Sequence, residues 1–401
     1  MIQMKYANLY VEKYDGKSLL LDFVQEGEFI YFRNSGDYVE TMRLREYEPT
    51  QILFHNVQGL NIKDGDVILF PMETLQKIRR EQIQNRNDGA RYRTIAFEIE
   101  NGEDYLENFK TSEKVEYGKN KELEYRIKTT WPNGSPCSLE HADRIDELWA
   151  LDVGQGSANF IFGQGRRLTI FDFGTDIYAS NAQIKKIIDD YYFCLTLYYT
   201  SLIISHWDCD HYNILTSFDD FLLRKLCCVF VPEKVISLTA KQVVKKLEKN
   251  CRYIVAFSSP KRKKRGRVGL QIVRGNANYQ LFMGETSSDT NKSGLALAVY
   301  GDNGVAMLTA DHRNSQVWKD MYAQMKPCKV DKELHIVVPH HGGDCGRLYK
   351  KLSIKTAGVA AVSVGKNSYN HPNKKTLDYY AKLGFIVKRT DLIGQDIIIP
   401  L

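Results

Sequence analysis

The chain has 401 residues, of which 43% are hydrophobic and 26% are charged, and its formal net charge is +6. This length suggests about two domains, and the mild basic excess permits a polyanionic partner without requiring one. No apolar run is long enough to cross a bilayer, and the first residues lack the apolar core of a secretion signal. We therefore expect a cytoplasmic protein with no membrane partner.

The first third of the chain mixes strand and helix patterns. Alternating or continuous apolar runs predict strands at residues 9–14, 18–24, 28–34 and 66–71. A polar helix is predicted over residues 72–86. The Pro- and Gly-rich segment TWPNGSPCS, at 130–138, predicts a loop and a boundary. We expect a small α+β domain at 1–140, which could bind a protein partner, and a second domain at 141–401.

The pattern of the second domain is that of layered α/β structure. Short strands with Gly-containing turns are predicted at residues 147–154, 158–163 and 167–174, and a buried strand at 201–206 ends in a histidine. Further strands are predicted at 226–232, 279–284, 295–301, 305–311 and 334–342, with helices at 181–192, 315–326 and 373–384. Polar residues gather at the strand ends, where ligand sites form in such architectures.

The densest group of these polar residues is S-H-W-D-C-D-H at 205–211. His206, Asp208, Asp210 and His211 fall within six residues, directly after an apolar strand. Side chains this close repel or desolvate one another unless a cation joins them. Imidazole nitrogen and carboxylate oxygen are suitable ligands for zinc, manganese or iron. The segment therefore predicts a metal site.

Other strand ends carry similar residues. Asp172 ends one strand, Asp311 ends another, and the adjacent His340 and His341 follow a third in V-V-P-H-H-G. Repeated Asp and His at strand ends make sense if the strands converge on metal ions.

Six segments together resemble one family. They are L-D-V-G-Q-G-S-A-N-F-I (151–161), I-F-D-F-G (170–174), S-H-W-D-C-D-H (205–211), L-T-A-D (308–311), V-P-H-H-G (338–342) and V-S-V-G-K-N-S-Y-N-H-P (362–372). In this order they resemble the metallo-β-lactamase-like domain of competence DNA-uptake proteins of the ComEC type. The resemblance spans about 147–401 and implies an αββα metallo-β-lactamase sandwich, a dinuclear site and phosphodiester hydrolysis on DNA.

The resemblance also implies roles for individual residues. His206 and Asp208 would bind one divalent ion, Asp311 would bridge two, and Asp172 would orient a ligand. Asp210, His211 and His340 would bind the second ion. Which of the two adjacent histidines ligates stays open, although His340 lies nearer the strand end. For catalysis, Asp210 would orient the nucleophile, and His341 or His371 would donate a proton to the leaving oxygen.

The chain departs from the commoner pattern of the superfamily in one half of this site. Asp208 stands where H-x-H-x-D-H has its second histidine, and no histidine occurs between His211 and His312. The first metal would therefore have few nitrogen ligands and mostly oxygen. We expect two divalent ions, zinc or manganese, and oxygen ligands favour manganese.

Basic residues offer candidate phosphate contacts. The run K-R-K-K-R-G-R at 261–267 suits a nucleic-acid backbone, although a solvated loop would have the same composition. Its candidates are Lys261, Arg262, Lys263, Lys264 and Arg265, and the S-V-G-K-N turn adds Lys366 and Asn367.

The leading interpretation is a DNA nuclease with a dinuclear metal site, and defence against foreign DNA is one hypothesis for its role. Hydrolysis of a small phosphodiester, such as a cyclic nucleotide or a phosphorylcholine ester, is the first alternative. Hydrolysis of C–O, C–N or C–S bonds is another. A metal-binding scaffold without catalysis is the alternative outside the enzyme class.

Overall fold

The computed structural model describes residues 4–33, 47–85, 93–115, 123–130, 142, 144–262, 268–287, 289–325, 332–349, 354–367 and 370–401. The chain divides into two compact units. The N-terminal unit comprises Met1–Arg126, Tyr178–Gln183 and Lys234–Lys246, and the C-terminal unit comprises Ile127–Ile177, Ile184–Glu233 and Leu247–Leu401. Most of the loop expected at 130–138 lies outside the described residues, so the boundary at residue 140 stays a prediction.

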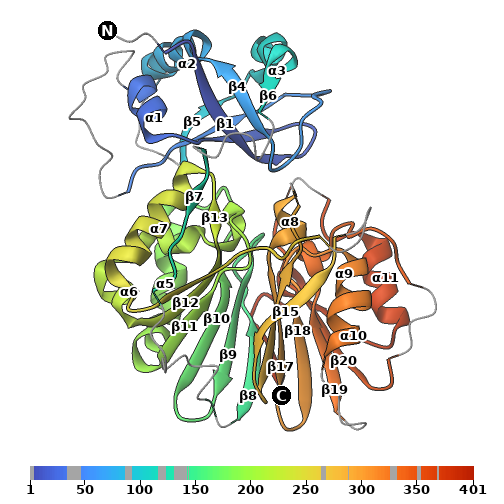
Figure 1. Ribbon diagram of the computed structural model, residues 1–401. Helices are drawn as coiled ribbons and strands as arrows, with labels where there is room; N and C mark the ends of the chain where they lie inside the picture. Colours follow the sequence, from blue (N-terminus) through green and yellow to red (C-terminus); the bar gives the residue numbers. More distant parts are fainter. Residues whose placement is uncertain are drawn as a thin grey trace. The chain divides into compact units, whose positions relative to one another are not determined.

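The N-terminal unit is a small α+β structure, as the sequence predicts. Its six-stranded sheet has the order β5-β3-β2-β1-β4-β6 (Figure 1). The strands are β1 (Tyr6–Tyr14), β2 (Leu19–Phe23), β3 (Gln51–Phe54), β4 (Val67–Pro71), β5 (Ile95–Ile99) and β6 (Glu113–Lys114). The helices are α1 (Glu26–Arg33), α2 (Met72–Asn85) and α3 (Leu106–Thr111), and β7 (Tyr125–Arg126) pairs with β13 (Lys234–Val235).

Helix α1 occupies residues for which the sequence pattern predicts a strand, so the strand expected at 28–34 is wrong. Phe29 and Phe32, three positions apart, both lie against Phe23 of β2, with ring centroids 5.2 Å away in each case. Glu26 and Glu28 stand in the first turn, where carboxylates stabilise a helix N-terminus. The hydrophobic pattern of a short aromatic run fits a buried helix as well as a strand. Packing against the sheet decides between the two structures.

A buried polar cluster joins β2 to helix α7 (Leu238–Asn250) within the N-terminal unit. The fully buried Asp22 accepts hydrogen bonds from Thr50 Oγ1 at 2.6 Å and from the Thr239 backbone N–H at 2.8 Å. Lys241 Nζ donates to the carbonyl oxygens of Val24 at 2.8 Å and Leu123 at 3.0 Å. These bonds satisfy polar groups that would otherwise destabilise the fold.

The C-terminal unit contains two seven-stranded sheets. The first has the order β14-β12-β11-β10-β9-β8-β22, and the second has the order β15-β16-β17-β18-β19-β20-β21. The first sheet consists of β8 (Ile145–Ala150), β9 (Ala158–Gly163), β10 (Arg167–Phe173), β11 (Tyr199–Ile203), β12 (Leu226–Pro232), β14 (Ile254–Phe257) and β22 (Ile397–Pro400). The second consists of β15 (Leu270–Gly275), β16 (Tyr279–Gly284), β17 (Leu295–Tyr300), β18 (Gly304–Leu308), β19 (Glu333–Val337), β20 (Ala357–Val362) and β21 (Ile386–Arg389).

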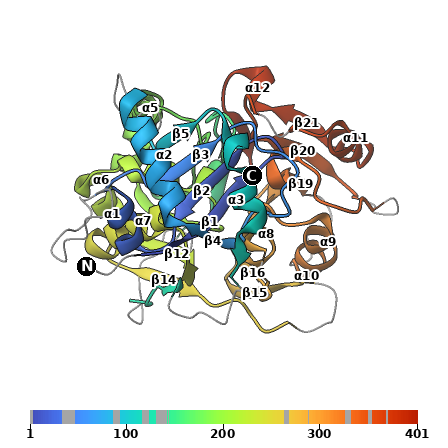
Figure 2. The same ribbon diagram turned by 90° about the horizontal axis from the view of Figure 1, so that it is seen from above.

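Helices cover the outer faces of these sheets (Figures 1 and 2). They are α5 (Asn181–Leu197), α6 (Asp220–Lys225), α9 (Asn314–Gln316), α10 (Tyr322–Gln324) and α11 (Lys374–Lys382), and a π-helical stretch, Val317–Met321, joins α9 to α10. The short helices α8 (Thr290–Ser293) and α12 (Thr390–Ile393) lie in connections between strands. Within the described residues, no helix is long and apolar enough to cross a membrane.

The apolar core shows that the two sheets pack face to face. One buried cluster contains Phe171 and Phe230 from the first sheet together with Leu297 and Leu308 from the second. On the outer face of the second sheet, Trp318 and Tyr380 of the covering helices belong to another buried cluster, with Ile336 of β19. On the outer face of the first sheet, Phe160 contacts Tyr191 of α5, with ring centroids 5.4 Å apart. The αββα sandwich expected from the sequence is confirmed.

Parallel strand pairs direct several strand ends to one edge of this sandwich. Strands β10, β11 and β12 run parallel in the first sheet, and β18, β19 and β20 run parallel in the second. The carboxyl ends of parallel neighbours lie at the same sheet edge. The residues that follow these strands are therefore brought together.

Protonation of Glu28 should couple to the stability of the N-terminal unit. Burial raises the pKa of Glu28 from 4.5 to about 7, so between these values the folded unit holds more protons than the unfolded chain. Stability should be greatest below pH 4.5 and fall as the pH rises to about 7, by about 3 kcal/mol at most. Burial of Lys241 lowers its pKa to about 8, so its titration lies above this window.

Hydrogen–deuterium exchange of the β1 and β2 amides, corrected for intrinsic rates, measures this free energy of opening. It should decrease across the window in the native chain and decrease less in Glu28→Gln, where Asp22, whose pKa burial also raises, still titrates. A level profile in the native chain would contradict the prediction.

Candidate metal centre

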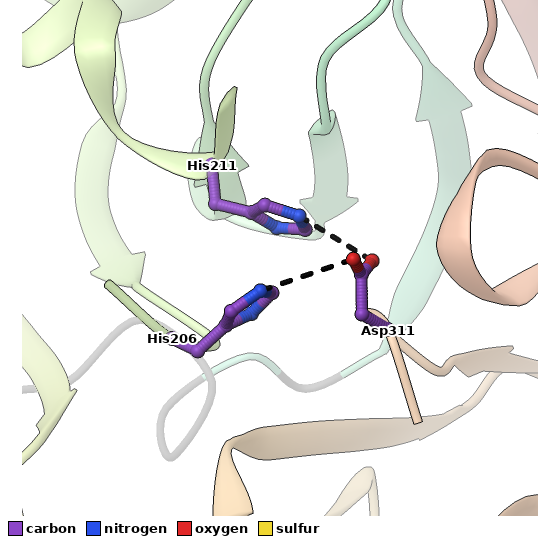
Figure 3. Close-up of side chains that lie close together, drawn as sticks. All are labelled: His206, His211 and Asp311. Atoms are coloured by element: carbon purple, nitrogen blue, oxygen red, sulfur yellow. Dashed lines mark ion pairs between the residues drawn. The ribbon is translucent and has the colours of Figure 1, made fainter. Parts of the chain in front are cut away.

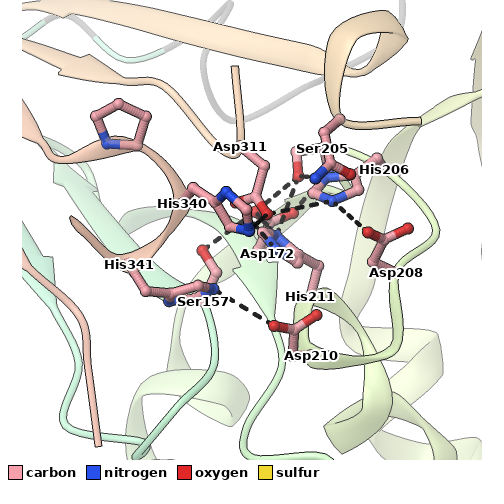
Figure 4. A network of polar contacts seen from close by, with 12 residues as sticks. Ser157, Asp172, Ser205, His206, Asp208, Asp210, His211, Asp311, His340 and His341 are labelled. Carbon is pink, nitrogen blue, oxygen red and sulfur yellow. Dashed lines mark hydrogen bonds and ion pairs between the residues drawn. The ribbon is translucent and has the colours of Figure 1, made fainter. Parts of the chain in front are cut away.

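Four chain segments at the sandwich edge supply the polar residues of the site (Figure 4). Asp172 lies near the end of β10, and the segment 205–211 follows β11. Asp311 follows β18, and the segment 339–342 follows β19. The sequence predicted each of these segments, and the structure brings all four together.

Glycine permits the close approach of two of these segments. A Cβ atom at Gly174 would lie 2.1 Å from the Asp210 carbonyl oxygen, so only glycine fits beside the turn Cys209–His211. The Ser157 N–H donates to the same carbonyl oxygen at 2.9 Å, and the Gly174 N–H donates to the Ser157 carbonyl at 2.9 Å. These contacts hold Asp210 and His211 against the end of β10.

His206, His211 and Asp311 form the first cluster of the site (Figure 3). His206 Nε2 lies 3.9 Å from Asp311 Oδ2, and His211 Nε2 lies 3.4 Å from Asp311 Oδ1. Asp208 Oδ2 lies 3.3 Å from His206 Nε2. One oxygen of Asp311 thus faces each histidine.

Asp210, His211 and His341 form the second cluster. His341 Nε2 lies 3.4 Å from Asp210 Oδ2, and the other ring nitrogen, Nδ1, donates to the Ser363 carbonyl oxygen at 2.9 Å. The buried ring of His341 is therefore held with Nε2 toward the cluster.

The adjacent His340 lies differently. Its Nε2 is 3.6 Å from Asp311 Oδ2, and its side chain is 23% exposed, against 4% for His341. Its ring contacts that of His371 edge to face, with centroids 5.0 Å apart. The geometry therefore groups His341 with Asp210 and His211, whereas the sequence favoured His340 for that place. His340 and His371 lie together on the more exposed side.

Asp172 supports the site from within the core. Its fully buried carboxylate accepts hydrogen bonds from the Ser205 N–H at 2.6 Å, Ser205 Oγ at 2.8 Å and His211 Nδ1 at 2.8 Å. The bond to Nδ1 turns Nε2 of His211 toward Asp311. This is the orienting position that the sequence resemblance implied for Asp172.

Ser205 is a contributor that the sequence reasoning missed. Its hydroxyl lies 2.9 Å from His206 Nδ1 and 3.3 Å from His211 Nδ1. Its position directly before His206 was the only signal in the sequence. An uncharged serine at a strand end is common, so the position alone does not mark it as part of a metal site.

Charge interactions shift the pKa values of the central residues. Burial alone would lower the pKa of His211, but the Asp172 and Asp311 carboxylates raise it well above its usual value. Burial likewise works against ionised Asp311, yet His340, His211 and His206 hold its pKa well below the usual range. The site therefore favours an ionised carboxylate facing several imidazole rings.

The residues present fit a metal ion. Nε2 of His206, His211 and His341 and Oδ2 of Asp208 are buried and make no hydrogen bond among the described residues. Two ligands bonded at about 2.1 Å to one tetrahedral ion lie about 3.4 Å apart, and the separations given above range from 3.3 to 3.9 Å. Buried polar atoms are normally satisfied, and a divalent cation would satisfy these.

The candidate phosphate contacts differ in their surroundings. Lys366 is exposed, whereas the Asn367 side chain donates to the carbonyls of Gly365 at 2.8 Å and His371 at 2.9 Å and so braces its own loop. Lys261 and Arg262 are exposed. Lys263, Lys264 and Arg265 lie outside the described residues.

Comparison with known proteins gives distant likenesses in structure. No family model and no curated protein matches the chain. A metal-dependent hydrolase of the β-lactamase superfamily is 10% identical over 64% of this chain and 100% of its own, with a TM-score of 0.34. The metallo-β-lactamase fold protein YhfI from Bacillus subtilis is 10% identical over the same shares, with a TM-score of 0.38. Human tRNase Z, short form, is 12% identical over 47% of this chain and 76% of its own, with a TM-score of 0.28. The case for a function therefore rests on the site itself.

Proposed function

We propose that this chain is a metallo-β-lactamase-fold, metal-dependent phosphodiester hydrolase that acts on DNA. The observation that carries the proposal is the convergence of buried imidazole nitrogens and carboxylate oxygens on two adjoining clusters at the sandwich edge. Such a set of ligands suits two divalent ions, zinc or manganese. When bound, such ions lower the pKa of water and stabilise the charge that develops on a phosphoryl group.

We divide the ligands between two halves of the site. The His206 half consists of His206, Asp208 and the Oδ2 atom of Asp311. The His211 half consists of Asp210, His211, His341 and the Oδ1 atom of Asp311. Asp311 would bridge the halves, because its two oxygens face different histidines, at 3.9 and 3.4 Å. This division exchanges the sequence-based roles of His340 and His341.

The remaining residues would act on the substrate and the proton. His340 is the more exposed of the adjacent histidines and lies beside His371. Nε2 of His340 would donate a proton to the leaving oxygen as the phosphodiester bond breaks, a role that imidazole can fill near neutral pH. Asp210 would help to orient the attacking water, and Asp172 would keep His211 in position.

The proposal of a polymeric substrate draws on the basic run. Its first residues, Lys261 and Arg262, follow Pro260, whose carbonyl accepts hydrogen bonds from Thr286 N–H at 2.9 Å and Thr286 Oγ1 at 3.2 Å. Thr290, four residues beyond Thr286, contacts Asp208 at 3.2 Å. The start of the run is thus tied to the segment that leads to Thr290, and its Lys and Arg residues would contact the phosphates of a strand.

Metal content and cleavage test the proposal together. We expect one to two manganese or zinc ions per chain and cleavage of linear DNA that exceeds cleavage of RNA and of small phosphodiesters. Asp311→Asn should lower cleavage by at least about a hundredfold, since the amide lacks the negative charge and the second oxygen through which Asp311 would bridge the halves. Elemental analysis and gel assays measure both quantities. A native chain that binds no metal after incubation with manganese and zinc would refute the proposal, and cleavage of small esters alone would refute its DNA part.

Asp172→Asn should weaken metal binding without removing a ligand. The amide keeps the shape of the carboxylate, but its NH₂ group would face one of the groups that donate hydrogen bonds to Asp172. We expect affinity to fall by about 10- to 100-fold, measured by metal retention during dialysis. Asp190→Asn, at an exposed ion pair with Lys186, is the matched control and should retain metal. Equal retention by both variants would argue against the orienting role.

Replacing Lys261, Arg262, Lys263 and Lys264 with alanine should weaken DNA binding and flatten its dependence on salt. The slope of log affinity against log salt should decrease by about 0.9 for each phosphate that the variant no longer neutralises. Fluorescence anisotropy over a salt series measures the slope. The fall in DNA cleavage should exceed the fall on a small chromogenic ester, and an unchanged slope would assign the run to the solvated surface.

A further inference from the structure

The segment Asp289–Gly294, which contains α8, borders the His206 half. It is held in place on two sides. Gln316 Nε2 donates to the Lys292 carbonyl at 2.8 Å, and the Leu295 N–H donates to the Ser205 carbonyl at 2.7 Å. A Cβ atom at Gly294 would lie 2.7 Å from the same Ser205 oxygen. The segment is therefore seated tightly against the residue that precedes His206.

One side chain of this segment reaches a proposed ligand. Thr290 Oγ1 donates to Asp208 Oδ1 at 3.2 Å, and Asn291 Oδ1, 3.3 Å away, is a second acceptor for the same hydroxyl. The other carboxylate oxygen, Oδ2, lies 3.3 Å from His206 Nε2, and the Asp208 side chain is only 5% exposed. Thr290 thus holds one oxygen of Asp208 while the second oxygen faces the metal-binding side of His206.

This contact matters more here than in a histidine-rich site. The chain has no histidine between His211 and His312. His340 Nε2 also lies 3.6 Å from Asp311 Oδ2, but we assign His340 to proton donation, so His206 is the one nitrogen ligand of its half. The other ligands there are carboxylate oxygens, and the direction of a carboxylate depends on what holds its second oxygen. A hydrogen bond to a ligand fixes its orientation and tunes its affinity for the ion.

We propose that Thr290 is a positioning residue for Asp208 and that its hydroxyl sets the affinity of the His206 half for a hard divalent cation. The inference rests on the proposed metal function. It adds a residue outside the segments that the sequence singled out, and it predicts an effect confined to one of the two halves.

The test measures Mn²⁺ binding to the full chain by equilibrium dialysis, with electron paramagnetic resonance to distinguish bound from free ion. The native chain should bind Mn²⁺ in two classes of site. Thr290→Val, which keeps the shape and removes the hydroxyl, should weaken one class about tenfold and leave the other unchanged. Thr290→Ser should bind as the native chain does. Thr356→Val, the same substitution directly before β20 and at the opposite end of that strand from Ser363, is the control and should also bind normally.

The possible outcomes distinguish failure of this inference from failure of the proposed metal-dependent function. Two unchanged classes in Thr290→Val would overturn the role of Thr290 alone. A loss in Thr290→Ser equal to that in Thr290→Val would also overturn it, because the hydroxyl would then not be the cause. If Thr290→Val does not fold, as judged by its melting curve, Thr290→Ala is compared with Thr290→Ser by the same criteria. A native chain that binds no Mn²⁺ would overturn the proposed metal function and this inference with it.

Discussion

The buried carboxylate of Asp172 organises the edge of the sandwich on which the candidate site lies. It takes hydrogen bonds from the Ser205 backbone, the Ser205 hydroxyl and His211 Nδ1. A polar group in the core is tolerated only when such donors surround it. Because Asp172 bonds to Nδ1 of His211, the other ring nitrogen, Nε2, faces the site. The orientation of the proposed ligands therefore depends on a residue in the core beneath them.

Local backbone conformation completes this arrangement. Asp172, Ala310, His340, His341 and Asn370 all have left-handed backbones, with φ between 44° and 58°. For a residue other than glycine, this conformation raises the free energy of the folded state by about 1 kcal/mol or more. These residues lie beside or within the proposed site. Asp172 lies near the end of β10, and Ala310, His340 and His341 lie shortly after β18 and β19, so these conformations turn the chain sharply at the strand ends.

Much of the candidate site was predictable because its residues follow apolar strands. The segment 205–211, Asp172 and Asp311 could be identified from their positions, since a strand end in a parallel sheet must lie at an edge. The roles of His340 and His341 could not be separated in this way. They are neighbours in the chain, and only the bond from His341 to the Ser363 carbonyl and the contact of His340 with His371 distinguish them. The sequence also could not show that the Asn367 side chain hydrogen-bonds within its own loop.

The sequence by itself determined a layered α/β architecture with Asp and His residues at its strand ends, because apolar periodicity records which face of each element is buried. Its resemblance to the metallo-β-lactamase-like domain implied the αββα sandwich. Tertiary structure alone decided that residues 26–33 form a helix, since aromatic packing on β2 outweighs a pattern that both structures share. It also decided the partners of Asp208 and Asp172. Thr290 and Ser205 are ordinary hydroxyl residues in the sequence. Thr290 reaches Asp208 only when the two sheets pack together, and Ser205 reaches Asp172 only when β11 pairs beside β10.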